Sequence, residues 1–206
     1  MLRWPVDPVR AVSARSLPEP GRAALAYEMK LDGFRAIIWR TSTGVRIQSR
    51  QGTDLTRYLP DLIDPLTSTL PARSVVDGEA LVWNTDHGRC DFSLLQHRLT
   101  AGRRLPEIVA QHPAHFVAFD LLRDGRGVKL LDQPLTVRRA KLARLLHGAP
   151  PALALCPQTD DLGVARGWLA EFGVAGVEGV VIKPLAGRYR PGGSGWTKVR
   201  ARSTAD

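Results

Sequence analysis

The stretch EMKLDGFR, residues 28–35, determines how this sequence is interpreted, because it places four charged side chains inside an otherwise apolar region. The apolar runs at residues 24–27 and 36–39 predict a buried strand on either side. Charges between two core strands are costly to bury unless they are paired or used. Asp32-Gly33 is a turn signal, so we expect Lys30 at a strand end, facing a cavity. A hairpin with an incidental ion pair is the alternative, and this stretch alone leaves it open.

The composition indicates a soluble globular protein with a proper core. The chain has 206 residues, of which 44% are hydrophobic and 24% charged. It contains no apolar run near the ~20 residues of a membrane helix and no signal-peptide pattern at its start, so we expect a cytoplasmic protein without a membrane partner. Cys90 and Cys156 lie far apart in the sequence, which predicts free thiols and argues against a disulfide framework or a zinc site.

The charge balance points to a polyanionic partner. The formal net charge is +9 and the isoelectric point is near 10.4. An arginine-rich, solvated surface would give the same balance. The lysines are few, however: Lys30, Lys129, Lys141, Lys183 and Lys198. A sequence that uses arginine for general positive charge is expected to keep lysine where an amine is required, since the two groups are not interchangeable.

The order of predicted elements favours an α+β fold. Residues 1–23 carry four prolines and are expected to form an extended N-terminal segment, followed by one domain over 24–206. We predict strands at 24–41, 45–49, 75–83, 115–122, 152–156, 177–184 and 196–200. Helices are predicted at 55–66 (interrupted by prolines), 91–99, 135–146, and from Asp160 or Asp161 to Gly173, with Asp91 and Thr136 as caps. Strands and helices do not alternate regularly, which indicates antiparallel sheets flanked by helices.

Four of the predicted strand regions carry charged residues at interior positions. They are Lys30/Asp32/Arg35, Asp77/Glu79, Glu178/Lys183 and Lys198/Arg200. One such strand is usually a structural ion pair, but four indicate a shared polar cleft, where carboxylates bind a metal and cations bind phosphates. Glycine-rich phosphate loops of the Walker A and G-x-G-x-x-G types are absent, so side chains would have to hold the phosphates.

Taken together, the motifs resemble those of the nucleotidyltransferase domain of ATP-dependent DNA ligases, most of all the bacterial ligases associated with end joining. The matching segments, in the family's order, are K-L-D-G-F-R at 30–35, S-R at 49–50, D-G-E at 77–79, F-D at 119–120, E-G-V-V-I-K at 178–183 and W-T-K-V-R at 196–200. The resemblance covers residues 24–200. It implies a covalent nucleotidyltransferase fold of ATP-grasp-like type, in which antiparallel sheets flanked by helices enclose a central nucleotide cleft.

The resemblance also implies roles for single residues. Lys30 would be the nucleophile that forms lysyl-AMP. The nucleotide would be bound by Glu28 (adenine amine), Arg35, Glu79 (ribose), Phe119 (adenine stacking), Lys183 and Lys198 (phosphates). Glu178 would hold Mg²⁺, with Mn²⁺ as an alternative, and Arg50 and Arg200 would contact DNA. Phe119 could instead pack in the core, Asp77 could close a turn, and Asp120 could orient backbone.

The nucleophile must lose its proton before it attacks. A free lysine titrates near ~10.4. We expect neighbouring cations such as Lys183 and Arg35, together with a bound metal, to disfavour the ammonium form of Lys30 and lower its pKa.

The implied activity is ATP-dependent strand joining. AMP would pass from ATP to Lys30 and then to a DNA 5′-phosphate, from which a 3′-hydroxyl displaces it. The expected partners are nicked or broken double-stranded DNA and an OB-fold domain or end-joining proteins in trans, and the chain is expected to be a bacterial monomer. The six residues after Arg200 cannot form the OB-fold domain that relatives carry, so that domain is expected to be absent. Arg200 also stands where many relatives have lysine. An RNA ligase, a capping-type nucleotidyltransferase and a non-catalytic DNA-binding module of the same fold remain alternatives.

Overall fold

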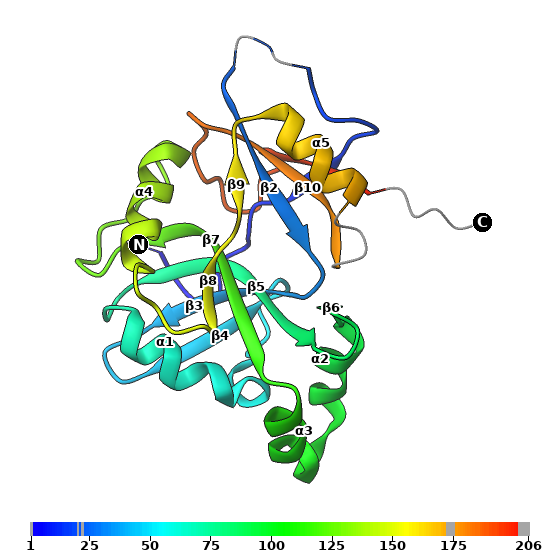
Figure 1. The fold of residues 1–206 in the computed structure, drawn as a ribbon. Coiled ribbons are helices and arrows are strands. Elements are labelled where there is room, and N and C mark those ends of the chain that lie inside the picture. Colours follow the sequence, from blue (N-terminus) through cyan, green and yellow to red (C-terminus); the bar gives the residue numbers. More distant parts are fainter. Residues whose placement is uncertain (1, 20, 22, 172–175, 202–206) are drawn as a thin grey trace.

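Two β-sheets lie against each other, and helices cover their outer sides (Figure 1). The computed structural model describes residues 2–19, 21, 23–171 and 176–201. Sheet 1 has the order β1 (Ala11–Ser13), β11 (Trp196–Arg200), β10 (Val177–Pro184), β2 (Leu25–Leu31) and β9 (Gln158–Thr159). Sheet 2 has the order β4 (Val45–Ser49), β3 (Phe34–Arg40), β5 (Val75–Asn84), β7 (Ala114–Arg123) and β8 (Leu153–Leu155), and β6 (Arg89–Cys90) pairs with β5. The helices are α1 (Ile63–Thr69), α2 (Phe92–Thr100), α3 (Leu105–Gln111), α4 (Leu135–Leu145) and α5 (Leu162–Glu171), with 3-10 turns η1 (Thr56–Tyr58), η2 (Pro60–Leu62) and η3 (Gly102–Arg104).

The α+β class is confirmed, and most strand pairs are antiparallel as predicted. Two pairs, β1 with β11 and β7 with β8, are parallel. β3 and β4 form the predicted hairpin. The hairpin alternative for residues 28–35 is wrong, because β2 and β3 belong to different sheets and Asp32-Gly33 carries the chain from one sheet to the other. A side chain at position 33 would overlap the carbonyl oxygen of Ala80, so only glycine fits this crossing.

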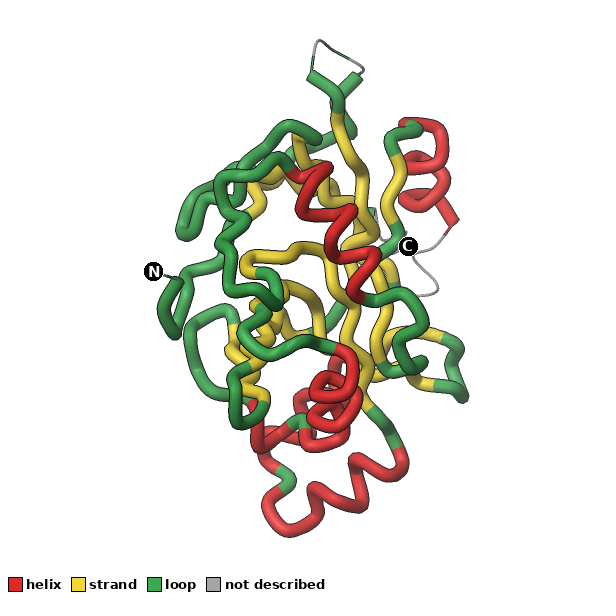
Figure 2. The backbone as a smooth tube through the Cα atoms, turned by 90° about the vertical axis from the view of Figure 1, so that its left-hand side faces the viewer, coloured by secondary structure: helices red, strands yellow, loops and turns green. Residues whose placement is uncertain are grey.

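Alternation of side chains along the strands divides the apolar residues into layers. α1, α2 and α4 cover the outer face of sheet 2 through Leu66, Leu95 and Leu142, all fully buried. On sheet 1, α5 packs through the buried Ala165 against the outer side. The inner faces of the two sheets are therefore left to face each other. In the tube view, the strands lie in the middle of the molecule and helices lie on the outside (Figure 2).

The helix termini follow the predicted caps in two cases out of three. The Asp91 carboxylate accepts from the backbone N–H groups of Ser93 and Leu94 at the start of α2, and Asp161 does the same for α5. The prediction for α4 is wrong, since Pro134 is the residue before that helix and no side chain caps it. Gly173, the predicted end of α5, lies outside the described residues. α3 had no counterpart in the prediction.

The N-terminal segment is extended, but it packs into the domain. Leu2, Val6 and Val9 are buried in an apolar cluster with sheet 2 residues. The Gln48 side chain accepts from the Val6 N–H at 3.0 Å and donates to the Val6 carbonyl at 2.6 Å, so it pairs with the segment as a strand would. Residues 11–13 then form β1 beside β11. Segment and domain thus share one core. None of the helices in the described ranges is long and apolar enough to cross a membrane.

Candidate active site

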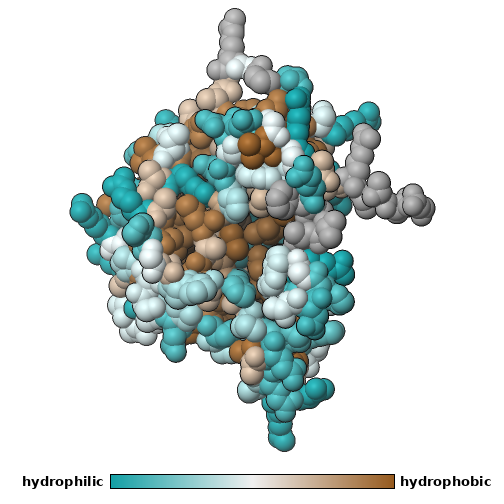
Figure 3. Space-filling model, viewed as in Figure 1, coloured by the Kyte–Doolittle hydropathy of each residue, from teal (hydrophilic) through white to brown (hydrophobic). Residues whose placement is uncertain are grey.

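A cavity of about 170 Å³ lies between the inner faces of the two sheets. Its lining includes the predicted residues Glu28, Lys30, Arg35, Arg50, Glu79, Phe119, Lys183 and Lys198. In the space-filling view, hydrophobic side chains gather in the central part of one face, whereas the projection formed by α2 and α3 is hydrophilic (Figure 3). The cavity lining thus brings together eight predicted residues that lie up to 170 positions apart in the sequence.

Strand register explains why the sheet 1 residues share a face. In β2, β10 and β11, Glu28 is paired with Val181 and Val181 with Lys198. Lys30, two positions after Glu28, lies opposite Gly179, and Gly179 lies opposite Arg200. Because side chains two apart in a strand point the same way, one face of sheet 1 carries Glu28, Lys30 and Lys198. Arg200 is exposed at the end of β11 and is not in the cavity lining.

Lys30 forms an ion pair with Glu178, and its side chain is 23% exposed. The pKa of the Lys30 amine is lowered, chiefly because burial disfavours its charged form. The carboxylates of Glu79 and Asp32 oppose this shift, whereas the cations of Lys198 and Arg200 reinforce it. The direction of the shift agrees with the prediction.

The predicted cause of that shift was different, because Lys183 and Arg35 were expected to supply it. Both cations are paired elsewhere: Lys183 lies 2.6 Å from a carboxylate oxygen of Glu28, and Arg35 binds Asp77. An ammonium or guanidinium whose charge is balanced by its own carboxylate exerts little repulsion on a third group. The sequence correctly predicts that these cations line the cavity, but it does not show which carboxylate each of them binds.

Arg35 is the centre of a buried network. Its guanidinium donates to both carboxylate oxygens of Asp77, at 3.0 and 2.6 Å, and to the Val9 carbonyl at 2.8 Å. The Tyr189 hydroxyl donates to Asp77 at 2.7 Å and accepts from the Val9 N–H at 3.3 Å. The expectation that Asp77 closes a turn is wrong, because Asp77 lies within β5 and binds Arg35 and Tyr189. The network binds the N-terminal segment to sheet 2 and leaves Arg35 facing the cavity from a constrained position.

Glu79 of β5 lies opposite Arg35 of β3 and lines the cavity. Its pKa is raised to about 8. Burial is the main cause, opposed by the nearby cations of Arg35 and Lys30 and reinforced by Asp77. A carboxyl that titrates near neutral pH can both donate and accept hydrogen bonds. This property suits a group that binds the hydroxyls of a ribose.

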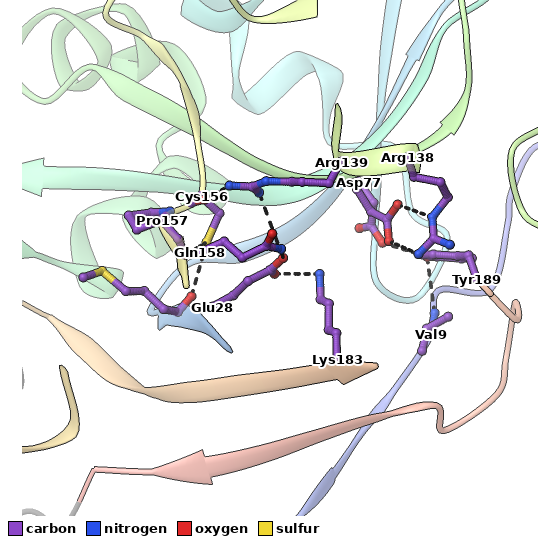
Figure 4. A network of polar contacts seen from close by, with 12 residues as sticks. Val9, Glu28, Asp77, Arg138, Arg139, Cys156, Pro157, Gln158, Lys183 and Tyr189 are labelled. Atoms are coloured by element: carbon purple, nitrogen blue, oxygen red, sulfur yellow. Dashed lines mark hydrogen bonds and ion pairs between the residues drawn. The ribbon is translucent and has the colours of Figure 1, made fainter. Parts of the chain in front are cut away.

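Glu28 is held in another part of the cavity by one hydrogen-bond donor and two cations, which come from three elements (Figure 4). Lys183 of β10 lies 2.6 Å from Oε2, Gln158 of β9 donates to Oε1 at 2.7 Å, and Arg139 of α4 lies 4.0 Å from Oε1. Glu28 and Lys183 are 2% and 1% exposed, so this ion pair is almost fully removed from solvent. In this structure the Lys183 ammonium is therefore paired with Glu28. To bind phosphates beside Lys30, it would have to leave that carboxylate.

Two aromatic rings close the cavity beside this pair. Phe119 and Trp196 meet edge to face, with centroids 5.9 Å apart. The Lys183 ammonium lies 4.5 Å from the Phe119 centroid and 4.0 Å from that of Trp196. The position of Phe119 in the lining is compatible with stacking on a base. Its neighbour Asp120 is fully buried and binds Arg138 of α4 at 2.7 Å, so it positions a helix.

Sequence reasoning missed Trp196, Tyr189 and Gln158 as site residues. Trp196 begins a recognised motif, yet its apolar character gave no reason to separate it from core residues. Tyr189 and Gln158 belong to segments without any motif, and only the three-dimensional contacts identify them. A polar residue next to a motif strand could have been found only with the strand pairing known.

The donor set fits a metal that is shared with a substrate. In the described part of the chain, no group of three or more His, Cys, Asp or Glu side chains could hold an ion by itself. Glu178 offers one carboxylate, 38% exposed, beside Lys30. Mg²⁺ is commonly held by one or two carboxylates together with substrate phosphates, and Glu178 meets that requirement.

A second groove of about 600 Å³ continues from Lys30 along the surface. It shares Lys30, Arg35, Arg50 and Glu79 with the first cavity and extends to Tyr58, Phe92 and Leu99. Arg50 lies at the junction of the two spaces. Any anionic chain bound in the groove would therefore pass a guanidinium close to Lys30.

Two facing sheets with three ion pairs and an aromatic wall between them fit a nucleotidyltransferase of the ligase class, and known proteins agree. Residues 8–200 match the model of the ATP dependent DNA ligase domain family, so this chain belongs to that family. It is 40% identical over 203 residues to DNA ligase C2 of Mycolicibacterium smegmatis, covering 98% of this chain and 55% of that protein. DNA ligase C of Mycobacterium tuberculosis is 37% identical, with 98% and 56% covered. The chain therefore spans a little over half the length of these relatives.

Solved structures confirm the fold. A mycobacterial DNA ligase D complexed with ATP and MES superposes with a TM-score of 0.66 and 29% identity, over 93% of this chain and 60% of that one. This agreement confirms the predicted nucleotidyltransferase fold and the resemblance to ligases of bacterial end joining.

Proposed function

We propose that this chain is the adenylating core of an ATP-dependent DNA ligase and that Lys30 carries AMP. The observation that carries the proposal is the amine of Lys30, partly buried, with a lowered pKa, at the wall of a cavity between the two sheets. Its unprotonated form attacks the α-phosphorus of ATP and forms a nitrogen–phosphorus bond. The bond from the α-phosphorus to the oxygen that bridges it to the β-phosphate breaks, and pyrophosphate leaves. The family and the names of the relatives support ATP and DNA as substrates.

The remaining residues divide between binding and charge balance. Glu79 binds the ribose, Phe119 stacks on the adenine, and Glu28 accepts from its amine, which favours ATP over GTP. Lys198 neutralises phosphate charge as the pyrophosphate departs. Lys183 joins this role once the triphosphate competes with Glu28 for its ammonium. Arg35, held by Asp77, orients the nucleotide.

Mg²⁺, or Mn²⁺ in its place, would be held by Glu178 and the substrate phosphates and would lower the charge repulsion between phosphate and nucleophile. Its binding would also draw Glu178 away from Lys30, which leaves the amine without its ion-pair partner.

DNA would follow the second groove. Arg50 at its junction and Arg200 at the end of β11 bind the backbone near the break, and the charge of +9 attracts the duplex. An OB-fold domain or an end-joining protein would complete the enclosure of the duplex. We further propose that the chain acts as a monomer in the bacterial cytoplasm.

The test is an intact-mass measurement after incubation with ATP and Mg²⁺. Wild-type protein should gain the mass of one AMP. Lys30→Arg should keep fold and charge but gain none, because a guanidinium stays protonated and is not a nucleophile. Lys129→Arg, at an exposed lysine outside the cavity, is the matched control and should behave as wild type. A normal adduct on Lys30→Arg would contradict the assignment.

The alternatives predict other substrates. A capping-type enzyme would form its adduct with GTP in preference to ATP, and an RNA ligase would transfer AMP to nicked RNA in preference to nicked DNA. A non-catalytic module would form no adduct with either nucleotide.

A further inference from the structure

The Glu28 carboxylate is unusually constrained for a group that lines a ligand cavity. It is 2% exposed, and both of its oxygens are engaged: Oε2 lies beside Lys183, and Oε1 accepts from Gln158 with Arg139 further away. Arg139 is itself oriented by a hydrogen bond to the Cys156 carbonyl. The carboxylate therefore cannot rotate without breaking a charge-assisted hydrogen bond.

Gln158 contributes to the cavity only through Glu28. Its strand β9 has two residues, and Gln158 is the one that lies opposite Glu28 in the pairing with β2 (Figure 4). The Gln158 side chain is absent from the cavity lining, whereas Glu28 is part of it. Because an ionised carboxylate only accepts, the amide must present its N–H₂ group to Glu28. Gln158 thus determines the orientation of Glu28 without facing the cavity itself.

We propose that Gln158 is a positioning residue that makes the site selective for a 6-aminopurine nucleotide over a 6-oxopurine nucleotide. This inference rests on the proposed function, in which Glu28 accepts from the adenine amine. A 6-amino group donates to an oriented carboxylate, whereas the oxygen of a 6-oxopurine meets it as a second acceptor. Sites built around a specific hydrogen bond reject analogues that cannot form it. An acceptor that is already oriented loses less free energy on binding than one that must be ordered.

Lys183 could in principle offer a donor to a 6-oxo group and offset this selectivity. Its ammonium, however, lies 2.6 Å from Glu28 Oε2 and over the rings of Phe119 and Trp196. In the proposed function it leaves Glu28 only for the triphosphate, so it does not serve the base. That placement leaves Glu28 as the group that distinguishes the two purines.

The test compares ATP with inosine triphosphate, which carries a 6-oxo group and shares the ribose and phosphates. The rate of adduct formation is measured against nucleotide concentration for wild type and for Gln158→Met, which keeps side-chain length and removes the donor. We expect KM for ATP to rise about tenfold, the scale of one hydrogen bond to a charged group. KM for inosine triphosphate should stay within about twofold, and kcat should hardly change.

Controls separate this role from a structural one. Gln133→Met, at an exposed position outside the cavity lining, should keep the wild-type ratio of the two KM values. If Gln158→Met unfolds, Gln158→Ser replaces it, because serine keeps a polar residue in β9 but is too short to reach Glu28. Equal increases of both KM values, or an unchanged ratio, would overturn the inference. A wild-type protein that forms no adduct would instead refute the proposed function.

Discussion

At the scale of single residues, three ion pairs balance charges in the cleft: Lys30 with Glu178, Lys183 with Glu28, and Arg35 with Asp77. The three differ in exposure. The Lys30–Glu178 pair is partly open to solvent, whereas the other two pairs contain a carboxylate that is at most 2% exposed. Removing one partner of a buried pair is costly, but a partly exposed pair can exchange partners readily. We therefore expect ligand binding to rearrange the Lys30–Glu178 pair first.

The lowered pKa of Lys30 predicts how adduct formation depends on pH. The reactive amine is unprotonated, so the rate should rise with pH and level off below pH 10.5, the ordinary lysine value. Single-turnover adduct formation at saturating ATP measures this profile. Glu79→Gln serves as control: its own group titrates at about 8 in the wild type, and the inflection that belongs to Lys30 should persist without it. An inflection at or above 10.5 would show that burial does not activate Lys30.

Glu178→Ala should slow adduct formation most strongly when Mg²⁺ is scarce. The variant removes the carboxylate that is paired with Lys30 and proposed to hold the ion, so more Mg²⁺ is needed to occupy the nucleotide phosphates. Titration of the rate with Mg²⁺ should show a midpoint shifted to higher concentration and partial recovery at saturation. Glu107→Ala, at an exposed acid of α3, should leave the midpoint unchanged. A defect that is the same at all Mg²⁺ concentrations would make Glu178 a structural residue.

At the scale of elements, the local pattern of the sequence predicted most strands and helices, because alternation, caps and turns are local properties. The start of α2 at Asp91 and the strand at residues 177–184 were predicted from such signals and are confirmed. The assignment of β2 and β3 to different sheets could not be predicted, since Asp32-Gly33 is equally suited to a hairpin. Thr136 failed as a cap because α4 begins one residue earlier, at Leu135 after Pro134, so Thr136 lies inside the helix.

The cap of α2 gives a stability prediction at this scale. Asp91→Ala should lower the free energy of unfolding by about 1 kcal/mol at neutral pH, because it leaves two backbone N–H groups without their acceptor. Urea unfolding measures the change, and Asp132→Ala, at an exposed position, is the control.

The same residue gives a pH dependence. The pKa of Asp91 is lowered to about 2, first because the Ser93 hydroxyl donates to it. Since the folded-state pKa lies below the ordinary 3.8, its contribution to stability is present above pH 3.8 and is lost as the pH falls through about 2. Asp91→Asn should keep the cap at neutral pH and remove this acid-dependent loss. An equal loss of stability in Asp91→Asn and wild type between pH 4 and 2 would contradict it.

At the scale of the whole molecule, charge and topology act together. The chain carries a net charge of +9, and its second groove begins at Lys30. The charge and motif order could be read from the sequence, and they led to the ligase class. The meeting of the N-terminal segment, the loop of Tyr189 and the short β9 around one cavity could not, because these contacts join segments up to 180 positions apart.

Duplex DNA binding should weaken steeply with salt. A protein with 6–10 phosphate contacts loses about 10³–10⁵ in affinity between 50 and 200 mM salt, because bound counterions are released. Fluorescence anisotropy with a nicked duplex at several salt concentrations gives the slope. Arg50→Gln should reduce the slope by about one phosphate contact, whereas Arg126→Gln, exposed and outside the groove, should not alter it. A flat salt profile would argue against DNA as the polyanion.

The crossing at Asp32-Gly33 has a consequence for how this chain can change in length. Two residues join sheet 1 to sheet 2, and the second has no room for a side chain beside Ala80. An inserted residue there would shift Lys30 relative to Arg35 and reverse the faces of one strand. The turn between β3 and β4, by contrast, is exposed at Thr43, and loops of this kind accept insertions at small cost. Insertions and deletions should therefore accumulate in the outer hairpin turns, while the spacing from Glu28 to Arg35 stays constant.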